Sequence, residues 1–526
     1  MKERRAKTVL VLAVVWIVII AALAVAYRYF LKPASDKKLT GQTGSGSRYE
    51  HHITVAMDSF SGYSILRSDA LDTGLQGHGI KLSIEDDGAD YVQRVKNLRD
   101  RDAQMAVFTV DSYIAAGAVV GEFPGSIVLV IDETKGADAI VTYEQGVKQV
   151  TDLNHGDARI VLTPNSPSEF LARTVIAHFN LPQLSEKWLV EADGAEDVYE
   201  KFRSADKTAR RAYVMWEPYV SKALDEAGAT VLLDSSRLEG YIVDVLVAER
   251  SFLRDHPDLV KTVLESYLRA AHSYGTAPNG MTRLVMEDAK ETGGETLDRD
   301  RAARLVDGIL WKNTLENYAH FGLLPADAAR GLPHIEDIIL NITKVLLQTG
   351  ALDGDPVEGG AHTLFYDRIL KELQAADFHP ARKLNVMSGV GAGAHDLEAV
   401  RGDTLLPALS DAQWEGLVEV GEMRTRPISF ARGTARINIQ SRRELAELAG
   451  RLEAWPHYYL TVVGRARAVG DPEANLRLAE QRAAAVIAIL REAGIHENRI
   501  RSEAMTLPGR GGEAQSVSFV VGQVPY

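Results

Sequence analysis

The sequence predicts an α/β protein with two large lobes, followed by a small α/β sandwich and preceded by one transmembrane helix. Short β-rich runs alternate with helical patterns from Ile53 to about Pro380, which is typical of α/β layers. A second, shorter alternation fills the C-terminal part, and an uncharged apolar run stands near the N-terminus. The chain of 526 residues is long enough for about two to four domains.

The composition excludes several classes of site. There are no cysteines, which excludes disulfides, thiolate metal ligands and cysteine nucleophiles. The formal net charge is −13 and no long basic run occurs, so we expect no nucleic-acid partner. The patterns GxxxxGK[ST], HExxH and GxSxG are absent. We therefore expect a binding protein rather than an enzyme, with no metal site and no cofactor.

The N-terminal apolar run predicts an inner-membrane anchor. Residues Thr8 to Ala26 carry no charge, and at about 1.5 Å per residue this run can cross a bilayer. Basic residues before the run place residues 1–7 in the cytoplasm, although basic residues also follow it. The alternative is a cleaved signal peptide, because Ala24-Val25-Ala26 fits a cleavage site. We expect a retained helix over 8–27, a single pass, and the bulk of the chain in the periplasm.

The remaining boundaries follow from composition and pattern. A polar segment rich in glycine and serine makes 28–50 a flexible linker. We expect the two-lobed domain over 51–385, because about 330 residues are too many for one core. Residues 386–420 begin with a Gly/Ala/Ser-rich stretch and predict a second linker. The small sandwich then occupies 421–526.

The two-lobed domain contains short β-rich runs, and their alternation with helical patterns favours largely parallel sheets; six examples follow. They are Ile53–Met57, Met105–Phe108, Ile127–Ile131, Ile160–Leu162, Tyr213–Met215 and Ile242–Val247. In the C-terminal sandwich we expect strands near Ile428–Phe430, Tyr459–Val463 and Ser516–Val521, with helices over Ser441–Ala454 and Pro472–Ala493.

Four strand-to-helix turns predict a ligand cleft. Each consists of a buried strand and then polar residues that open a helix, within 55–63, 107–111, 160–169 and 213–218. In open α/β sheets, ligands bind beyond the carboxyl ends of strands, where helix N-termini offer free N–H groups. The third turn also predicts a capping box, with Ser166 as N-cap, Pro167 at N1 and Glu169 at N3. The alternative is that these residues only cap helices, as every αβ protein requires.

The middle of the chain resembles extracytoplasmic solute-binding proteins of the nitrate, sulfonate and taurine type. The resemblance covers roughly 51–380 and rests on the order of VLVIDETKGADA (128–139), GVKQVTDL (146–153), WEPY (216–219), DSS (234–236) and YIVDVLV (241–247). It implies the type II periplasmic-binding-protein fold, in which two lobes joined by two crossovers close on a solute. The crossovers would lie near Asp132–Asp138 and Leu233–Gly240.

This resemblance also implies a set of ligand-binding positions in the cleft. They are Ser59, Tyr63, Thr109, Asp111, Asp138, Ser166, Ser168, Trp216, Glu217 and Asp244. Trp216 has the alternative of a core position, and Asp132 and Asp138 that of bracing the hinge. The turns contain carboxylates but no Lys or Arg, which favours a small polar solute that is zwitterionic or an amine.

The C-terminal part resembles the OmpA C-terminal family, across about 421–526. The matching positions are Gly464, Gly470, Asn475, Leu478, Arg482, Ala483, Gly494, Ile495, Arg499 and Ile500. The resemblance implies binding of peptidoglycan, in which an Asp of the family takes the ammonium of diaminopimelate and an Arg takes its carboxylate. The implied wall-binding set here is Gly464, Arg467, Asp471, Asn475 and Arg482.

Two of these positions depart from simple expectation. The family's Asp position is occupied by Arg467, so Asp471 is the candidate for a replacement carboxylate. Arg482 stands on a largely apolar helix face, where an Arg either has a partner or packs its stem and extends its head to solvent.

Together these features predict a membrane-anchored periplasmic solute-binding receptor or sensor that the OmpA-like domain tethers to the cell wall. Two alternatives remain open. The protein is an envelope scaffold that no longer binds a solute, or it is the substrate-binding component of an ABC transporter.

Overall fold

The structure is a computed structural model. It describes residues 49–238, 240–292, 296–329, 331–382, 397–401, 406–431, 433–453, 455–467, 470–507 and 517–524. The anchor predicted over 8–27 lies outside the described residues, as do the cytoplasmic 1–7 and nearly all of the linker 28–50. Within the described ranges, no helix is both long enough and apolar enough to span a bilayer.

The described residues form two compact units. The smaller one contains 49–53 and 72–83. Its two segments are joined by a backbone hydrogen bond, in which Glu50 N donates to Gly79 O at 2.7 Å. A side-chain hydrogen bond also joins them, in which Gln76 Nε2 donates to the Tyr49 hydroxyl at 2.7 Å. The larger unit contains 54–71 and the chain from Ile84 onward, and all sites discussed below lie within it.

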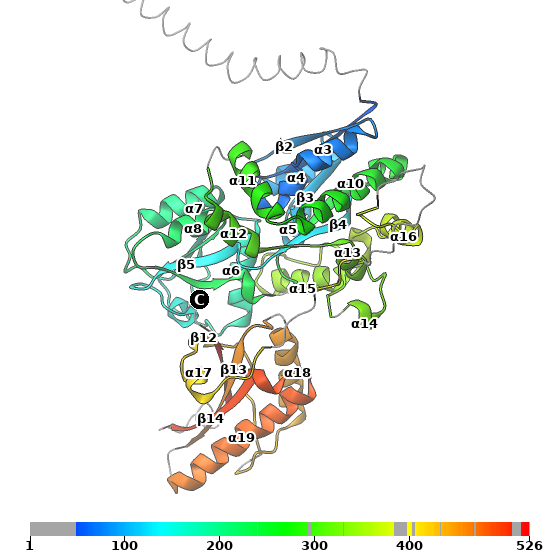
Figure 1. The fold of residues 1–526 in the computed structure, drawn as a ribbon. Helices are drawn as coiled ribbons and strands as arrows, with labels where there is room; N and C mark the ends of the chain where they lie inside the picture. The colour runs from blue at the N-terminus through cyan, green and yellow to red at the C-terminus, as the bar shows by residue number, and fades with distance from the viewer. Residues whose placement is uncertain are drawn as a thin grey trace, which may run out of the picture. The chain divides into compact units, whose positions relative to one another are not determined.

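The first lobe is built on a mixed sheet with the strand order β11-β4-β10-β3-β1-β2 (Figure 1). The strands are β1 (His51–Met57), β2 (Ile80–Asp86), β3 (Met105–Thr109), β4 (Gly125–Thr134), β10 (Val243–Glu249) and β11 (Ile309–Trp311). Its helices are α3 (Asp69–Gln76), α4 (Tyr91–Asp100), α5 (Val110–Val120), α9 (Arg250–Asp255), α10 (Pro257–Thr276), α11 (Gly280–Thr292), α12 (Arg299–Asp307), α13 (Thr314–His320), α14 (Ala326–Ala329), α15 (Ile335–Gln348) and α16 (Arg368–Ala375). The first lobe also contains the short 3₁₀ helices η2 (Ser61–Ile65) and η5 (Ala361–Leu364).

The second lobe has a five-stranded sheet in the order β7-β6-β8-β5-β9. The strands are β5 (Asp138–Tyr143), β6 (Arg159–Leu162), β7 (Leu189–Glu191), β8 (Arg211–Trp216) and β9 (Ala229–Asp234). The helices are α6 (Pro167–His178), α7 (Gly194–Arg203) and α8 (Tyr219–Leu224), with 3₁₀ turns η3 (Val150–Leu153) and η4 (Ser235–Arg237). All six strands predicted for the two-lobed domain coincide with observed strands.

The chain crosses between the two sheets twice. It leaves the first lobe at the end of β4 and enters the second at β5, and it returns from β9 to β10. Both crossovers lie where the sequence predicts them. The prediction of largely parallel sheets is wrong, because the returning strand β10 runs antiparallel to both β3 and β4 between which it inserts. In the second lobe, β5 is likewise antiparallel to β8 and β9.

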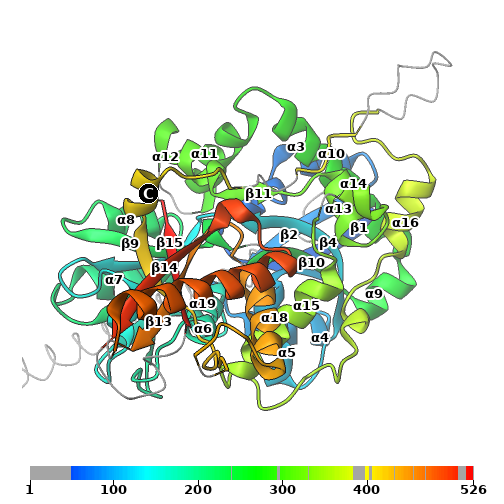
Figure 2. The same ribbon diagram turned by 90° about the horizontal axis from the view of Figure 1, so that it is seen from below.

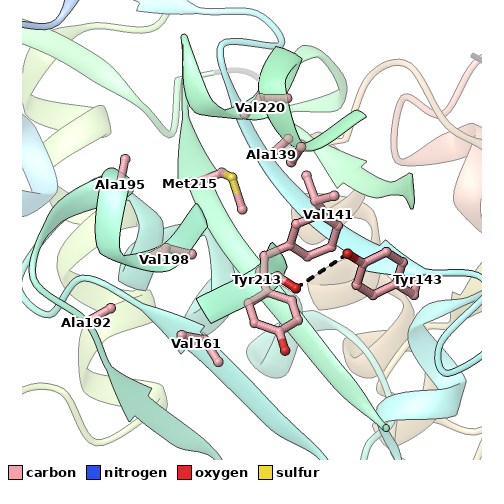
Figure 3. Packing of buried hydrophobic residues seen from close by; sticks show 12 residues of the cluster. Ala139, Val141, Tyr143, Val161, Ala192, Ala195, Val198, Tyr213, Met215 and Val220 are labelled. Carbon is pink, nitrogen blue, oxygen red and sulfur yellow. Dashed lines mark hydrogen bonds between the residues drawn. The ribbon is translucent and has the colours of Figure 1, made fainter. Parts of the chain in front are cut away.

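A compact apolar cluster holds the second lobe together (Figure 3). The stacked rings of Tyr143 and Phe202 lie 4.3 Å apart between centroids, and the Tyr143 hydroxyl donates to Phe202 O at 3.4 Å. Met215 and Val220 are fully or nearly buried in the same cluster, and Trp216 packs against its edge. The indole of Trp216 is therefore supported from behind by close-packed side chains.

The C-terminal domain has a four-stranded sheet in the order β12-β15-β13-β14. The strands are β12 (Val418–Glu422), β13 (Tyr459–Arg467), β14 (Ile500–Leu507) and β15 (Val517–Gln523). The helices are α17 (Asp411–Glu415), α18 (Ile439–Glu453) and α19 (Pro472–Glu492), with the 3₁₀ turn η6 (Glu497–Arg499). Figure 2 shows α19 lying across β13 and β14, which it contacts.

Two expectations for this domain need correction. The strand near Ile428–Phe430 is reduced to one isolated bridge, between Phe430 and Ile437. The domain begins earlier than 421, because β12 starts at Val418 and pairs antiparallel with β15. The sequence gives little signal for β12, since two of its five residues are glutamates and one is a glycine. The strand β14 is also missed, although it pairs with β13 over the length of both.

Part of the predicted linker 386–420 is docked on the first lobe. The Arg401 guanidinium contacts Glu316 at 2.7 Å, and Arg401 N donates to the same carboxylate at 3.1 Å. The His272 ring contacts Glu398 at 2.6 Å, and Val400 is buried. The segment 397–401 is therefore held in place by side-chain contacts rather than free.

The C-terminal domain also contacts the second lobe directly. The Trp455 indole N–H donates to His178 Nδ1 at 2.7 Å, and both side chains are buried. A backbone hydrogen bond also joins the C-terminal domain to the second lobe, since Asn180 N, just after α6, donates to Glu422 O of β12 at 2.9 Å. Burial lowers the pKa of His178 to about 3, so the ring is neutral and its Nδ1 accepts.

Candidate functional site

Strand ends from both lobes meet at a small cavity. Its volume is about 20 Å³, which is room for about one water molecule. The first lobe contributes Asp58, Phe60, Tyr63, Tyr91, Thr109 and Asp244, the second contributes Asp138, Pro167 and Trp216, and the crossovers contribute Thr134 and Ile242. We call this space the interlobe cavity.

Two buried carboxyl groups lie side by side, and one of them, Asp244, lines this cavity. Asp132 of β4 and Asp244 of β10 are directly opposite cross-strand partners, and they are 0% and 1% exposed. The Tyr63 hydroxyl donates to Asp244 Oδ1 at 2.5 Å. Burial raises the pKa of both carboxyls, that of Asp132 to about 7, and the negative charge of Asp132 raises the pKa of Asp244 further. The pair therefore retains a proton that an exposed pair would have lost by pH 5.

A third carboxyl group faces this pair from the second lobe. Asp138 is 2% exposed, and burial raises its pKa to about 7, with the negative charge of Asp58 adding to the effect. Asp132, Asp138 and Asp244 each have at least one carboxylate oxygen without a hydrogen-bond partner among the described residues. A buried polar atom without a partner is costly, so these oxygens favour a proton or a donor ligand.

Other charges near the cavity are already neutralised. The Arg94 guanidinium is fully buried and contacts Asp58 at 3.0 Å and Asp87 at 2.5 Å. At the crossovers, the buried Lys312 ammonium pairs with Glu133 at 2.8 Å. The Lys312 ammonium helps to hold the pKa of Glu133 below its usual range, and Arg94 fixes Asp58. Neither cation forms an ion pair with the three carboxyls described above.

Aromatic rings form the remaining walls. Phe60 and Tyr63 meet edge to face, with centroids 5.3 Å apart, and Trp216 enters from the second lobe. An aromatic face attracts a cation, and a carboxylate at the same place adds a direct charge interaction. The interlobe cavity thus suits a small cation such as an ammonium group, whereas an anion would meet three carboxyl groups.

The structure brings together five of the ten predicted ligand-binding residues. Tyr63, Thr109, Asp138, Trp216 and Asp244 line the interlobe cavity. Thr109 also acts as N-cap of α5, since its side chain accepts from Ser112 N.

The other predicted residues lie elsewhere. Ser59 is exposed, while its neighbours Asp58 and Phe60 face the cavity. Glu217 caps α8, because its carboxylate accepts from Ser221 N at 3.0 Å and from the Ser221 hydroxyl at 2.7 Å. Ser168 is fully buried in the first turn of α6, and Asp111 and Ser166 line a second, larger cavity.

The capping box predicted for α6 does not form, although Pro167 does begin the helix as predicted. The Ser166 hydroxyl donates to Thr163 O at 2.6 Å instead of capping the helix. Glu169 accepts from Asn165 N at 2.6 Å and pairs with Arg173 at 2.6 Å. The backbone at Asn165 is left-handed, with a φ of 54°, and the Glu169 carboxylate accepts from the N–H of Asn165 rather than from that of Ser166.

Sequence reasoning missed half of the cavity. Tyr91 comes from α4 and Ile242 from a crossover, and neither stands in one of the four turns. Asp58 stands in the first turn, and its position directly after the strand was an available signal. Asp132 was considered only as a hinge brace, because nothing local indicates that it faces Asp244.

The C-terminal domain has a close strand–helix contact and a buried cation. A Cβ added at Gly464 would lie 2.0 Å from Ala479 O, so only glycine allows β13 to approach α19 there. Arg482 of α19 is 3% exposed and lies over the Phe430 ring at 5.0 Å. Its guanidinium donates to Thr434 O at 3.3 Å and to Arg465 O at 3.2 Å.

Residues 429–512 match the OmpA family model. The C-terminal domain is an OmpA-family domain. Asp471 of this domain is exposed and is the N-cap of α19, accepting from Glu473 N at 3.0 Å. Its carboxylate therefore already has backbone partners. Arg467 and Asn475 also have interaction partners within the protein.

The two-lobed part is similar to several solved structures at low sequence identity. The periplasmic aliphatic sulphonate binding protein of Escherichia coli is 16% identical, with a TM-score of 0.44, and covers 60% of this chain and 92% of its own. The nitrate-binding protein of Synechocystis PCC 6803 is 10% identical, with a TM-score of 0.47, and covers 62% and 88%. The alkanesulfonate-binding protein of Xanthomonas axonopodis pv. citri, bound to MOPS, is 14% identical, with a TM-score of 0.45, and covers 60% and 98%. No curated protein matches the sequence.

Proposed function

We propose that this protein is a periplasmic solute-binding receptor, anchored in the inner membrane and held at the cell wall by its OmpA-family domain. The observation that carries the proposal is the interlobe cavity. Two lobes joined by two crossovers meet there around three buried carboxyl groups and aromatic walls, which is an arrangement that can close on a solute. The protein binds and signals rather than catalyses.

The proposed ligand is a small amine or a zwitterion that presents its ammonium group to the cavity. Lobe opening would enlarge the space, since about 20 Å³ holds no solute larger than water. On binding, the ammonium donates to Asp138 and Asp244 and lies against the Trp216 ring. At Asp138 and Asp244, a charge-assisted hydrogen bond from the ammonium replaces the proton or the missing partner of a carboxylate oxygen.

A thermal-shift screen of the full-length protein tests this proposal. The probes are small alkylamines, amino acids, sulfonates and nitrate. An amine at 100 times its Kd should stabilise the protein by about 2.7 kcal/mol, and sulfonates and nitrate should not. The Asp244→Asn variant should lose the part of the shift that the interlobe cavity supplies, whereas the exposed Asp327→Asn variant keeps the whole shift. A shift with nitrate or sulfonates alone contradicts the proposed ligand class.

A second candidate function is a scaffold that has lost its solute, and the small volume of the interlobe cavity favours it. In a scaffold the carboxyl pair is kept protonated and the lobes stay closed. Asp244→Asn would then stabilise the protein, and no probe in the screen would shift its melting.

Wall attachment and anchoring are tested separately. Full-length protein should sediment with purified sacculi, and Arg467→Asp should strengthen this if the family's diaminopimelate contact is used. Asp471→Ala should leave sedimentation unchanged, because that carboxylate caps α19. Fractionation with N-terminal sequencing tests the anchor, and a free mature protein that begins at Tyr27 would contradict it.

A further inference from the structure

A second cavity, of about 860 Å³, lies beside the interlobe cavity. The two share no lining residue, but they adjoin at the N-termini of α5 and α6. Thr109 and Pro167 line the interlobe cavity, while Asp111 and Ser166 line the larger one. A volume of this size is within the usual range of about 300–1,000 Å³ for small-molecule sites. We call it the α5–α6 cavity.

A buried carboxyl group stands at the inner end of this cavity. Asp111 is 2% exposed, and its Oδ1 has no hydrogen-bond partner among the described residues. The sequence analysis assigned Asp111 to the cleft, but the structure places it on the α5–α6 cavity instead. No ion pair with a Lys or Arg among the described residues neutralises it. An unsatisfied oxygen at this depth is a ready acceptor for a donor ligand.

The charges around the cavity are mostly negative. Glu169, Asp353, Asp355 and Glu358 line it together with Asp111. Arg250 is the cation of the lining, and its guanidinium donates to two carbonyls of lining residues, Phe123 O at 3.0 Å and Thr363 O at 2.8 Å. Glu169 is paired with Arg173, which leaves the acidic loop 353–358 as the uncompensated charge. Burial raises the pKa of Asp111 to about 8, so its carboxyl ionises when a bound cation compensates it.

Apolar side chains form another part of the lining, beside the polar Asn165, Ser166 and Thr363. Phe170, Leu346, Leu352 and Leu364 face the cavity from α6, α15 and the segment that follows α15. A ligand that fills this space therefore gains by burying a short apolar stem, and its polar end must satisfy a carboxylate.

We propose that the α5–α6 cavity is a second ligand site that takes a small organic cation, with a protonated amine or guanidinium on a short alkyl stem. The cationic head pairs with Asp111, the stem packs against Phe170 and Leu352, and the acidic loop 353–358 attracts the cation to the entrance. This site is independent of the solute proposed for the interlobe cavity.

Matched probes with one stem and three heads test the proposal. Full-length protein is titrated by calorimetry with n-pentylamine, n-pentanol and pentanoate. We expect pentylamine to bind at least tenfold more tightly than pentanol, and pentanoate to bind most weakly. Asp111→Asn should weaken pentylamine at least tenfold with little effect on pentanol. Ala118→Trp, which fills the cavity, should weaken both pentylamine and pentanol. The exposed Asp327→Asn variant is the matched control and should bind like the wild type.

Two results would overturn the proposal. The first is equal binding of pentylamine by Asp111→Asn and the wild type. The second is loss of pentylamine binding in Asp244→Asn but not in Asp111→Asn, which would place the amine in the interlobe cavity and support the proposed function instead. If the interlobe cavity binds no solute, so that the proposed function fails alone, Asp111→Asn and Ala118→Trp should still weaken the binding of pentylamine.

Discussion

Replacing Asp132 with Asn should flatten the pH dependence of the protein's stability. Asp132 and Asp244 are opposite each other on β4 and β10, are both buried, and are paired with no cation among the described residues. In the unfolded chain each carboxyl loses its proton near pH 4. In the folded chain burial raises the pKa of Asp132 to about 7, so folding takes up a proton between these values.

The sign and size follow from this uptake. A raised folded-state pKa gives stability that is fully present below about pH 4 and is lost as the pH rises towards 7. One proton taken up on folding costs about 1.4 kcal/mol for each pH unit. Between pH 5 and 6.5 the wild type should therefore lose about 2 kcal/mol more than Asp132→Asn. Buried acids remote from Asp132 titrate in both proteins and cancel in the difference. Asp244 loses the effect of the Asp132 charge, but burial, the largest cause of its raised pKa, acts on it in both proteins.

Urea unfolding of the full-length protein at pH 5, 5.75 and 6.5 measures this difference. Asp327→Asn, an exposed carboxylate of the first lobe, is the control for the substitution itself and should follow the wild type. Parallel curves for wild type and Asp132→Asn over this range would refute the reasoning, because they would mean that Asp132 is ionised throughout.

Three further substitutions test contacts described above. Arg401→Ala should lower the stability of the first lobe by about 1–3 kcal/mol, because it leaves the buried Glu316 carboxylate without its cation. The double variant with Glu316→Gln should recover most of the lost melting temperature. Gly464→Ala should destabilise the OmpA-family domain by about 1–3 kcal/mol, because the new methyl meets Ala479 O at 2.0 Å, and hydrogen exchange in β13 should show it. Arg482→Ala should also lower the unfolding midpoint of this domain, by more than Arg482→Lys, because it removes two bonds to backbone carbonyls and the ring contact.

The sequence by itself determined several of the buried strands and their order along the chain, although it missed β12 and β14. Hydrophobic runs such as Met105–Phe108 and Tyr213–Met215 can be satisfied only as buried strands, and the polar residues after them must begin helices. The resemblance to solute-binding proteins implied a cleft with ten lining residues, and five of them, Tyr63, Thr109, Asp138, Trp216 and Asp244, do line one cavity. The OmpA-like spacing likewise identified the C-terminal domain, which the family match confirms.

The tertiary structure alone decided which neighbouring residues share a site. Successive residues at a helix start point about 100° apart, so Thr109 faces the interlobe cavity while Asp111, two positions on, faces the α5–α6 cavity. No local pattern reports the rotation of a helix about its own axis, which is set by packing against elements far away in the sequence.

The same limit explains Asp132 and Arg482. Asp132 meets Asp244 only because β10 returns from the second lobe and inserts beside β4, and this insertion also makes the sheet mixed. Arg482 is covered by Phe430 and Thr434, which come from a segment some fifty residues earlier. Local sequence determines what each segment can form, whereas pairing between distant segments depends on which chain direction and which faces bury the most apolar surface together.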